Sequence, residues 1–180
     1  MRKELYSGQA WNTAGSNRWQ LATLQQWLRD TYINYLNISS IVKSVKIPYA
    51  QGLSTSTVYT GASGLTSTAF LLSCYELGWT TNDNYRIPVD GAKLSYFDSG
   101  TGDSANTKRV AYMNGHYEEA PIYRAVWWTR DPNTSNSTDV FYVASDGSYT
   151  YSSATGECYI RPCFIIPSDT EVDEFGNIVV

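Results

Sequence analysis

Charged side chains are scarce in this sequence, and their scarcity argues against several functions. Asp, Glu, Lys and Arg make up 17% of the 180 residues, against roughly 25% in an average soluble domain. The net charge is −4, so the chain lacks the positive charge of a nucleic-acid-binding surface. The longest apolar run, Ala69–Leu72, is far too short to cross a membrane, and Met1–Leu5 has no hydrophobic signal-peptide core. We therefore expect no nucleic-acid partner, no membrane insertion and no signal peptide in this chain.

Cysteine and histidine are also few. The three cysteines are Cys74, Cys158 and Cys163, and an odd number does not indicate a disulfide scaffold. Cys158 and Cys163 are five residues apart, so an extended chain would place their side chains on opposite faces. We expect three ordinary thiols and no zinc site. A single histidine excludes a His-Glu-x-x-His site, and there is no Gly-x-Ser-x-Gly elbow, so the sequence favours a protein that is not an enzyme. A catalytic triad or a carboxylate pair assembled from distant residues stays open, although no spacing indicates one.

Aromatic residues, in contrast, are abundant. Fifteen Tyr, six Trp and five Phe give an aromatic content of 14%, accompanied by many Ser, Thr, Asn and Gly residues. Binding loops use this composition, because Tyr and Trp supply rigid contact area and the small polar residues adapt their hydrogen bonds. A β-rich fold uses the same residues in its strands, so composition alone leaves both interpretations open.

The clearest local pattern is one amphipathic helix. Thr23 and Gln26 have the spacing of a capping box, and apolar residues then recur at helical spacing until Asn37, where we expect the helix to end. A second short helix is predicted from Ser39 to about Val45. Residues 51–67 read as a long loop or a weak hairpin, and residues 78–109 as mostly irregular loops.

The remaining patterns predict strands. Ala69–Ser73 is a short apolar run typical of a central strand, and the Asp-Gly turn at residues 146–147 predicts a hairpin. The other expected strands are Ala125–Arg130, Val140–Val143, Tyr149–Tyr151 and Tyr159–Ile166, the last being a strand pair or one bent strand.

Several motifs along the chain together resemble a known family. In chain order they are Leu24, Trp27 and Leu28; Leu71, Leu72, Ser73 and Glu76; Trp127, Trp128, Arg130 and Pro132; Val143 and Gly147; and Ile160, Arg161 and Pro162. This ordered set resembles the DUF6273 domains of bacteria and phages over roughly residues 5–168. Thr129, Asp131 and Cys163 depart mildly from the family pattern. The final Arg-Pro strand is also similar to the end of the C-type-lectin and sulfatase-modifying-factor superfamily.

The resemblance implies an α+β, C-type-lectin-like fold, with one or two helices packed on a small twisted antiparallel sheet and long irregular loops. It implies a single domain over residues 1–168. The residues that follow form a tail over 169–180 that is acidic and then apolar. The resemblance also implies display on a phage particle or a bacterial surface. The apolar end, Ile178–Val180, would suit contact with another subunit or a homo-oligomer.

We place the candidate ligand contacts outside the shared motifs. Arg130 and Arg161 belong to the motifs, so we expect them to be structural, bridging strands to a buried carboxylate or to carbonyls. Trp127 and Trp128 face opposite ways on a strand, so one should lie in the core and the other under a loop or against the helix. The candidates for ligand binding are aromatic residues and the lone histidine in or beside the loops: Tyr96, Tyr112, His116, Tyr117, Tyr142, Tyr149 and Tyr151. The alternative for each is an ordinary packing or surface residue.

The resulting hypothesis is a non-enzymatic binding domain that recognises a host-surface glycan or protein. One alternative is a purely structural virion decoration or assembly domain, in contact with other virion or surface subunits. A less favoured alternative is an oxidase of the sulfatase-modifying type with copper bound by Cys158 and Cys163. We expect no cofactor. Acidic turns at residues 82–84 and 98–103 offer oxygen ligands for Ca²⁺, but neither matches an EF-hand loop.

Overall fold

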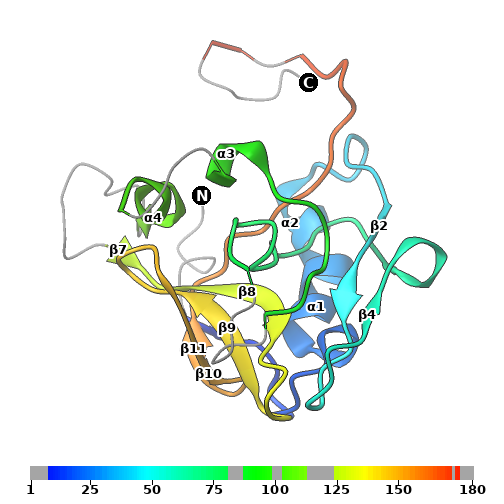
Figure 1. Ribbon diagram of the computed structural model, residues 1–180. Coiled ribbons are helices and arrows are strands. Elements are labelled where there is room, and N and C mark those ends of the chain that lie inside the picture. Colours follow the sequence, from blue (N-terminus) through cyan, green and yellow to red (C-terminus); the bar gives the residue numbers. More distant parts are fainter. Residues whose placement is uncertain (1–7, 81–86, 99–102, 113–123, 172, 175–180) are drawn as a thin grey trace.

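The computed structural model describes residues 8–80, 87–98, 103–112, 124–171 and 173–174, which form an α+β domain (Figure 1). One main helix is built from α1 (Thr23–Trp27), the π-helical turn η3 (Leu28–Tyr32) and α2 (Ile33–Leu36). Around it lie several small antiparallel sheets that do not close into a barrel. Among the described residues, no helix is long and apolar enough to span a membrane.

The helix agrees with the predicted apolar stripe and begins at Thr23 as predicted, but its N-terminal cap differs from the prediction. Asn37 ends it in the left-handed conformation (φ 57°), as expected from the sequence. The predicted capping box is wrong, because Ala22 occupies the cap position and Thr23 is already helical. The short 3₁₀ turn η2 (Trp19–Leu21) directly precedes the helix. The Thr23 hydroxyl does not cap the helix but accepts a hydrogen bond from the backbone N–H of Thr13 at 3.1 Å.

The predicted helix at residues 39–45 is also wrong. Residues 39–41 form only a turn, Lys43 bridges to Ile165, and Val45 begins a strand. Of the two predictions for residues 51–67, the hairpin is closer to the structure, although it is divided into two short strand pairs. In these pairs β3 (Tyr49–Ala50) lies beside β4 (Val58–Tyr59), and β2 (Val45–Ile47) lies beside β5 (Leu65–Ser67). A 3₁₀ turn, η4 (Gly61–Ser63), separates β4 from β5.

The largest sheet contains three strands in the order β10–β9–β8, namely Tyr149–Ser153, Asp139–Val143 and Trp127–Pro132. The predicted hairpin through Asp146-Gly147 joins β9 to β10. Gly147 has φ 83°, and a Cβ there would collide with the carbonyl oxygen of Asn106. All of β8 is buried, and its register with β9 shifts between Trp128 and Pro132.

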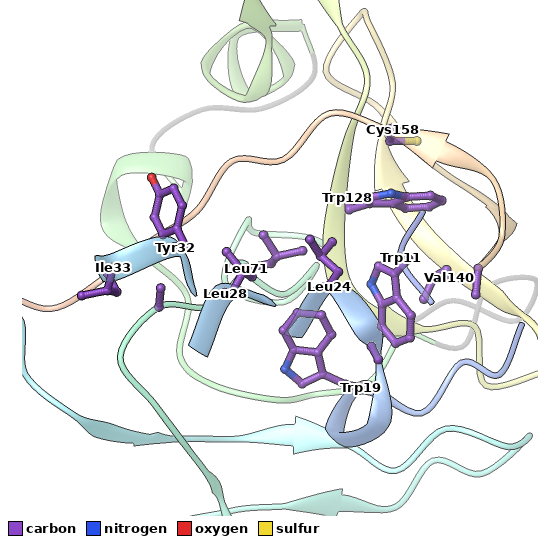
Figure 2. Packing of buried hydrophobic residues seen from close by; sticks show 13 residues of the cluster. Trp11, Trp19, Leu24, Leu28, Tyr32, Ile33, Leu71, Trp128, Val140 and Cys158 are labelled. Carbon is purple, nitrogen blue, oxygen red and sulfur yellow. The ribbon is translucent and has the colours of Figure 1, made fainter. Parts of the chain in front are cut away.

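The sheet packs on the helix through a core of aromatic and aliphatic side chains (Figure 2). Trp128 and Val140 meet Leu24 and Leu28 of the helix, while Trp127 and Val143 belong to a second core on the opposite side of the sheet. Both tryptophans are therefore buried: Trp128 lies against the helix, as expected for one of the two, and Trp127 lies in the second core. Its indole N–H donates to the Arg109 carbonyl at 3.0 Å.

Residues 69–74 cross the interior without forming the predicted central strand. Phe70 makes a single bridge to Cys163, and the Leu72 carbonyl accepts the backbone N–H of Arg130. The segment is buried because it is apolar, but its backbone partners are isolated and form no ladder. The last predicted strand is likewise one extended stretch with single bridges, at Tyr159, Cys163 and Ile165.

The remaining elements are short. β1 (Gln9–Ala10) pairs with β11 (Glu157–Cys158), and β6 (Ala111–Tyr112) pairs with β7 (Arg124–Ala125). Within the segment expected to be mostly irregular, the structure has two helices, α3 (Ser95–Asp98) and α4 (Asp103–Arg109). The apolar tail Ile178–Val180 and the turn at residues 82–84 lie outside the described residues.

Candidate functional site

Three of the predicted contact residues lie on the β9–β10 hairpin, but they do not share one face. Tyr149 pairs with Val143 and Tyr151 with Phe141, whereas Thr150 pairs with Tyr142. Directly paired residues point to the same side of a sheet. Tyr149 and Tyr151 therefore lie on the side of Phe141, and Tyr142 lies on the other side, where its ring meets Trp128 edge to face at 5.8 Å.

Tyr149 and Tyr151 form part of a row of aromatic rings on one face of the hairpin. The ring centroids of Trp79 and Tyr149 are 5.1 Å apart, those of Tyr149 and Phe141 are 6.0 Å apart, and those of Phe141 and Tyr151 are 6.2 Å apart. Phe141 is buried, Trp79 and Tyr149 are half-buried, and Tyr151 is 42% exposed. We call these four residues the aromatic row. Trp79 was not among the residues predicted from the sequence, because its proximity to the hairpin depends on the tertiary fold.

The Trp79 end of the aromatic row carries a cation. The Arg109 guanidinium lies 4.5 Å from the centroid of the Trp79 ring, and its Nε donates to the Leu77 carbonyl at 2.7 Å. Arg109 is only 4% exposed, and burial lowers the pKa of its guanidinium. Arg109 thus supports Trp79 from within the protein and fixes the orientation of the ring.

The other predicted contact residues lie away from the row or outside the described residues. Tyr96 on α3 is 61% exposed; its ring packs edge to face on Phe97, and Lys108 lies 5.3 Å from its centroid. Tyr112 is half-buried in β6, opposite Arg124. His116 and Tyr117 lie outside the described residues.

A buried ion network surrounds Arg130. The Arg130 side chain is fully buried and binds both carboxylate oxygens of Glu76, at 2.6 and 2.9 Å. Its Nε donates to Asp90 at 3.0 Å, and its Nη1 donates to the Leu71 carbonyl. The expected structural role of Arg130 is thereby confirmed. Desolvation by burial is outweighed by the surrounding carboxylates, which raise the pKa of the Arg130 guanidinium and keep it charged.

A third carboxyl group, that of Asp131, lies beside Asp90 in the same network. Asp131 accepts the backbone N–H of Cys74 at 2.6 Å, but the second oxygens of Asp90 and Asp131 have no donor among the described residues. A proton shared between the two carboxyl groups would satisfy both oxygens. Burial raises the pKa of Asp131 well above its usual value and that of Asp90 to about 6. Because Asp90 pairs directly with the Arg130 guanidinium at 3.0 Å, we assign the shared proton to Asp131.

Among the described residues, the side chains of the network are largely shielded from solvent. Glu76, its most accessible member, has a side chain that is only 12% exposed. Asp90 could be read from the sequence only as part of an Asp-Gly turn, and nothing local connects that turn to Arg130, 40 residues away. Gly91, with φ 97°, lies close to the Glu76 carboxylate. Any other residue here would place its Cβ 2.5 Å from that carboxylate, so the network requires glycine at this position.

The cysteines are three free thiols, as predicted. Burial raises the pKa of Cys158 to about 12 and that of Cys163 to about 11, so both are protonated near neutral pH. Cys158 belongs to the core beside the helix, and Cys163 packs against the second core. Among the described residues, no group of three or more His, Cys, Asp or Glu side chains is arranged to hold a metal ion.

Arg161, the other motif arginine, lies over Trp127, with 5.2 Å between the guanidinium and the ring centroid. Its Nη1 is buried without a hydrogen-bond partner among the described residues. The contact with Trp127 ties the closing segment of the chain to β8.

The fold and its surface define a small α+β domain with an aromatic row, supported at Trp79 by Arg109, and with a separate buried ion network around Arg130. The chain belongs to the DUF6273 family, described as a domain of unknown function, whose model matches residues 1–168. No curated protein and no solved structure matches it.

Proposed function

We propose that this domain is a non-enzymatic binding module that recognises a glycan on a host-cell surface through the aromatic row. The supporting observation is the row itself, in which four rings follow one another across Trp79, Tyr149, Phe141 and Tyr151 and end in an exposed tyrosine. Sugar rings present apolar C–H faces that pack on aromatic rings, while the tyrosine hydroxyls can hydrogen-bond to sugar hydroxyls.

The hairpin turn beside the row adds polar groups. The Asp146 carboxylate accepts the N–H and the hydroxyl of Ser148, at 2.9 and 2.6 Å, and these bonds lower its pKa. An exposed carboxylate three residues from Tyr149 is an acceptor for sugar hydroxyls at the edge of the ring surface. Apolar stacking with polar groups at the rim is the usual composition of a binding surface.

The proposal includes a C-type-lectin-like fold and display on a phage particle or a bacterial surface. Its support is the ordered set of motifs shared with similar domains, together with the helix that packs against a small antiparallel sheet. A purely structural role in a virion would place its contacts at the apolar tail, and no observation on the described residues favours that alternative.

Replacing Tyr151 with alanine should weaken glycan binding about tenfold or more, because an exposed stacking ring contributes about 1.4 kcal/mol or more to binding. The measurement is binding to a glycan array and to purified bacterial cell-wall polysaccharide. Tyr149→Ala should act in the same direction, and Tyr151→Phe should retain most of the stacking.

The matched control is Tyr35→Ala, which removes an exposed tyrosine from α2, outside the aromatic row. It should leave binding unchanged, and thermal unfolding should confirm that every variant is folded. The proposal fails if the wild-type protein binds no glycan, or if Tyr149→Ala and Tyr151→Ala combined leave binding intact. Binding to cells that is lost after protease treatment would indicate a protein ligand instead.

A further inference from the structure

A pocket of about 220 Å³ lies between β1 and the start of the main helix, away from the aromatic row. Its lining consists of Gln9, Ala10, Thr13, Thr23, Leu24 and Trp27. The indole N–H of Trp128 donates to the Gln9 carbonyl at 2.7 Å, and Leu24 packs in the same core as Trp128. The pocket therefore lies on the Trp128 side of the three-stranded sheet, and the aromatic row lies on the other.

Among the described residues, the pocket lining combines one aromatic ring with two aliphatic and three uncharged polar side chains. Trp27 is half-buried, and its ring is held by Tyr32, with the centroids 5.4 Å apart. Thr13 and Thr23 each bring a hydroxyl group. The Thr23 oxygen already accepts the Thr13 backbone N–H, so its own O–H is directed elsewhere. Gln9 adds an exposed amide side chain.

Size and charge restrict what such a pocket can hold. Pockets for drug-sized ligands begin at about 300 Å³, so this pocket suits a smaller molecule. Among the described residues, no charged side chain lines it, which disfavours a phosphate, a carboxylate or an ammonium group as the main point of recognition. An aromatic wall with hydroxyl and amide groups around it matches a neutral ring that has apolar C–H groups on its faces and hydroxyls at its edge.

We propose that this pocket, the Trp27 pocket, binds a single neutral sugar ring as a second site. The ring stacks on Trp27 and hydrogen-bonds to Thr13, Thr23 and Gln9. The site is independent of the aromatic row, because it uses other residues on the opposite side of the sheet. A ligand of this size, held by few polar contacts, should bind with a dissociation constant of about 1 mM.

The test is a titration of the full chain with methyl α-glucopyranoside and with N-acetylglucosamine, each followed by the indole N–H signals in ¹H–¹⁵N NMR spectra. The Trp27 signal, assigned from a Trp27→Phe variant, should shift in a saturable manner with at least one of the two sugars. Ala10→Leu, which fills the pocket from β1, should weaken binding at least tenfold. Thr13→Val should weaken it severalfold, because this change removes a hydroxyl while preserving the shape of the side chain.

The matched control is Thr66→Val, the same substitution at an exposed position of β5, outside the pocket. It should leave the titration unchanged. Tyr151→Ala should also have no effect on the Trp27 signal, so the result is separate from that for the aromatic row. The proposal is overturned if neither sugar moves the Trp27 signal, or if the shift survives Ala10→Leu in a protein whose remaining spectrum shows that it is folded.

Discussion

Replacing Arg130 with methionine should lower the free energy of unfolding by about 3–5 kcal/mol. Methionine preserves much of the volume of the side chain but leaves Glu76 and Asp90 without their buried cation. Two carboxylates in a site of low polarity then repel each other, and the Leu71 carbonyl loses its donor. Denaturant unfolding followed by tryptophan fluorescence would measure the change.

The matched control is Arg29→Met. Arg29 also forms an ion pair, with Asp30 at 2.6 Å, but both side chains are largely exposed. An exposed pair contributes only about 0–1 kcal/mol, so this control should unfold almost as the wild type does. The double variant Arg130→Met with Asp90→Asn should lose less free energy of unfolding than the sum of the two single variants. The reason is that Asp90→Asn removes a carboxylate that Arg130→Met leaves without its cation. Equal costs for Arg130→Met and Arg29→Met would contradict the assigned role of Arg130.

Replacing Asp131 with asparagine should stabilise the protein at neutral and alkaline pH. The amide of the Asp131→Asn variant can donate to Asp90 and accept the Cys74 N–H without needing a proton from solvent. We expect the free energy of unfolding at pH 8 to rise by more than about 1.4 kcal/mol, the equivalent of one pKa unit.

The same network predicts how wild-type stability varies with pH. Burial raises the pKa of Asp90 to about 6 and that of Asp131 well above its usual value, while an exposed aspartate titrates near 3.8. The folded protein thus retains protons that the unfolded chain has released, so stability should fall as the pH rises from about 4 through these folded-state pKa values. Each retained proton contributes a slope of about 1.4 kcal/mol per pH unit. In the Asp131→Asn variant the slope of stability against pH should be smaller by the contribution of one proton.

The control for this effect is Asp146→Asn at the exposed hairpin turn. Hydrogen bonds from Ser148 lower the pKa of Asp146, so its carboxylate stabilises the folded state, and this contribution is lost only in acid. Asp146→Asn should therefore give no gain at pH 8. Denaturant unfolding at several pH values would measure both variants. A wild-type stability that does not fall between pH 4 and pH 7 would contradict the shared proton.

Local patterns predicted the elements whose partners are near in sequence. The apolar stripe from Leu24 onward indicated the main helix, and Asn37 ends it because this residue tolerates a left-handed backbone. The Asp-Gly turn indicated the β9–β10 hairpin, because its glycine supplies the required positive φ. Predictions failed where tertiary packing overrode propensity: residues 69–73 have the composition of a strand but find no neighbouring ladder.

The sequence predicted only part of the candidate site. Tyr149 and Tyr151 were among the predicted contacts, and strand alternation could show that they share a face. Trp79 could not be added to them, because its contact with Tyr149 spans 70 residues of chain. The predicted set also included Tyr142, which the register of the hairpin turns toward Trp128 and the core.

The sequence by itself determined the composition of this domain, its helix, its hairpin and the order of the shared motifs, because each of these depends on residues close together in the chain. Only the tertiary structure decided which carboxylates surround Arg130, since Glu76 and Asp90 lie 54 and 40 residues away. It also decided which tyrosines lie beside Trp79 and which turn inward. Such neighbours result from the packing of segments that are far apart in the chain. Because burial removes water from a charged group, each buried charge needs a partner, and here that partner comes from a distant segment.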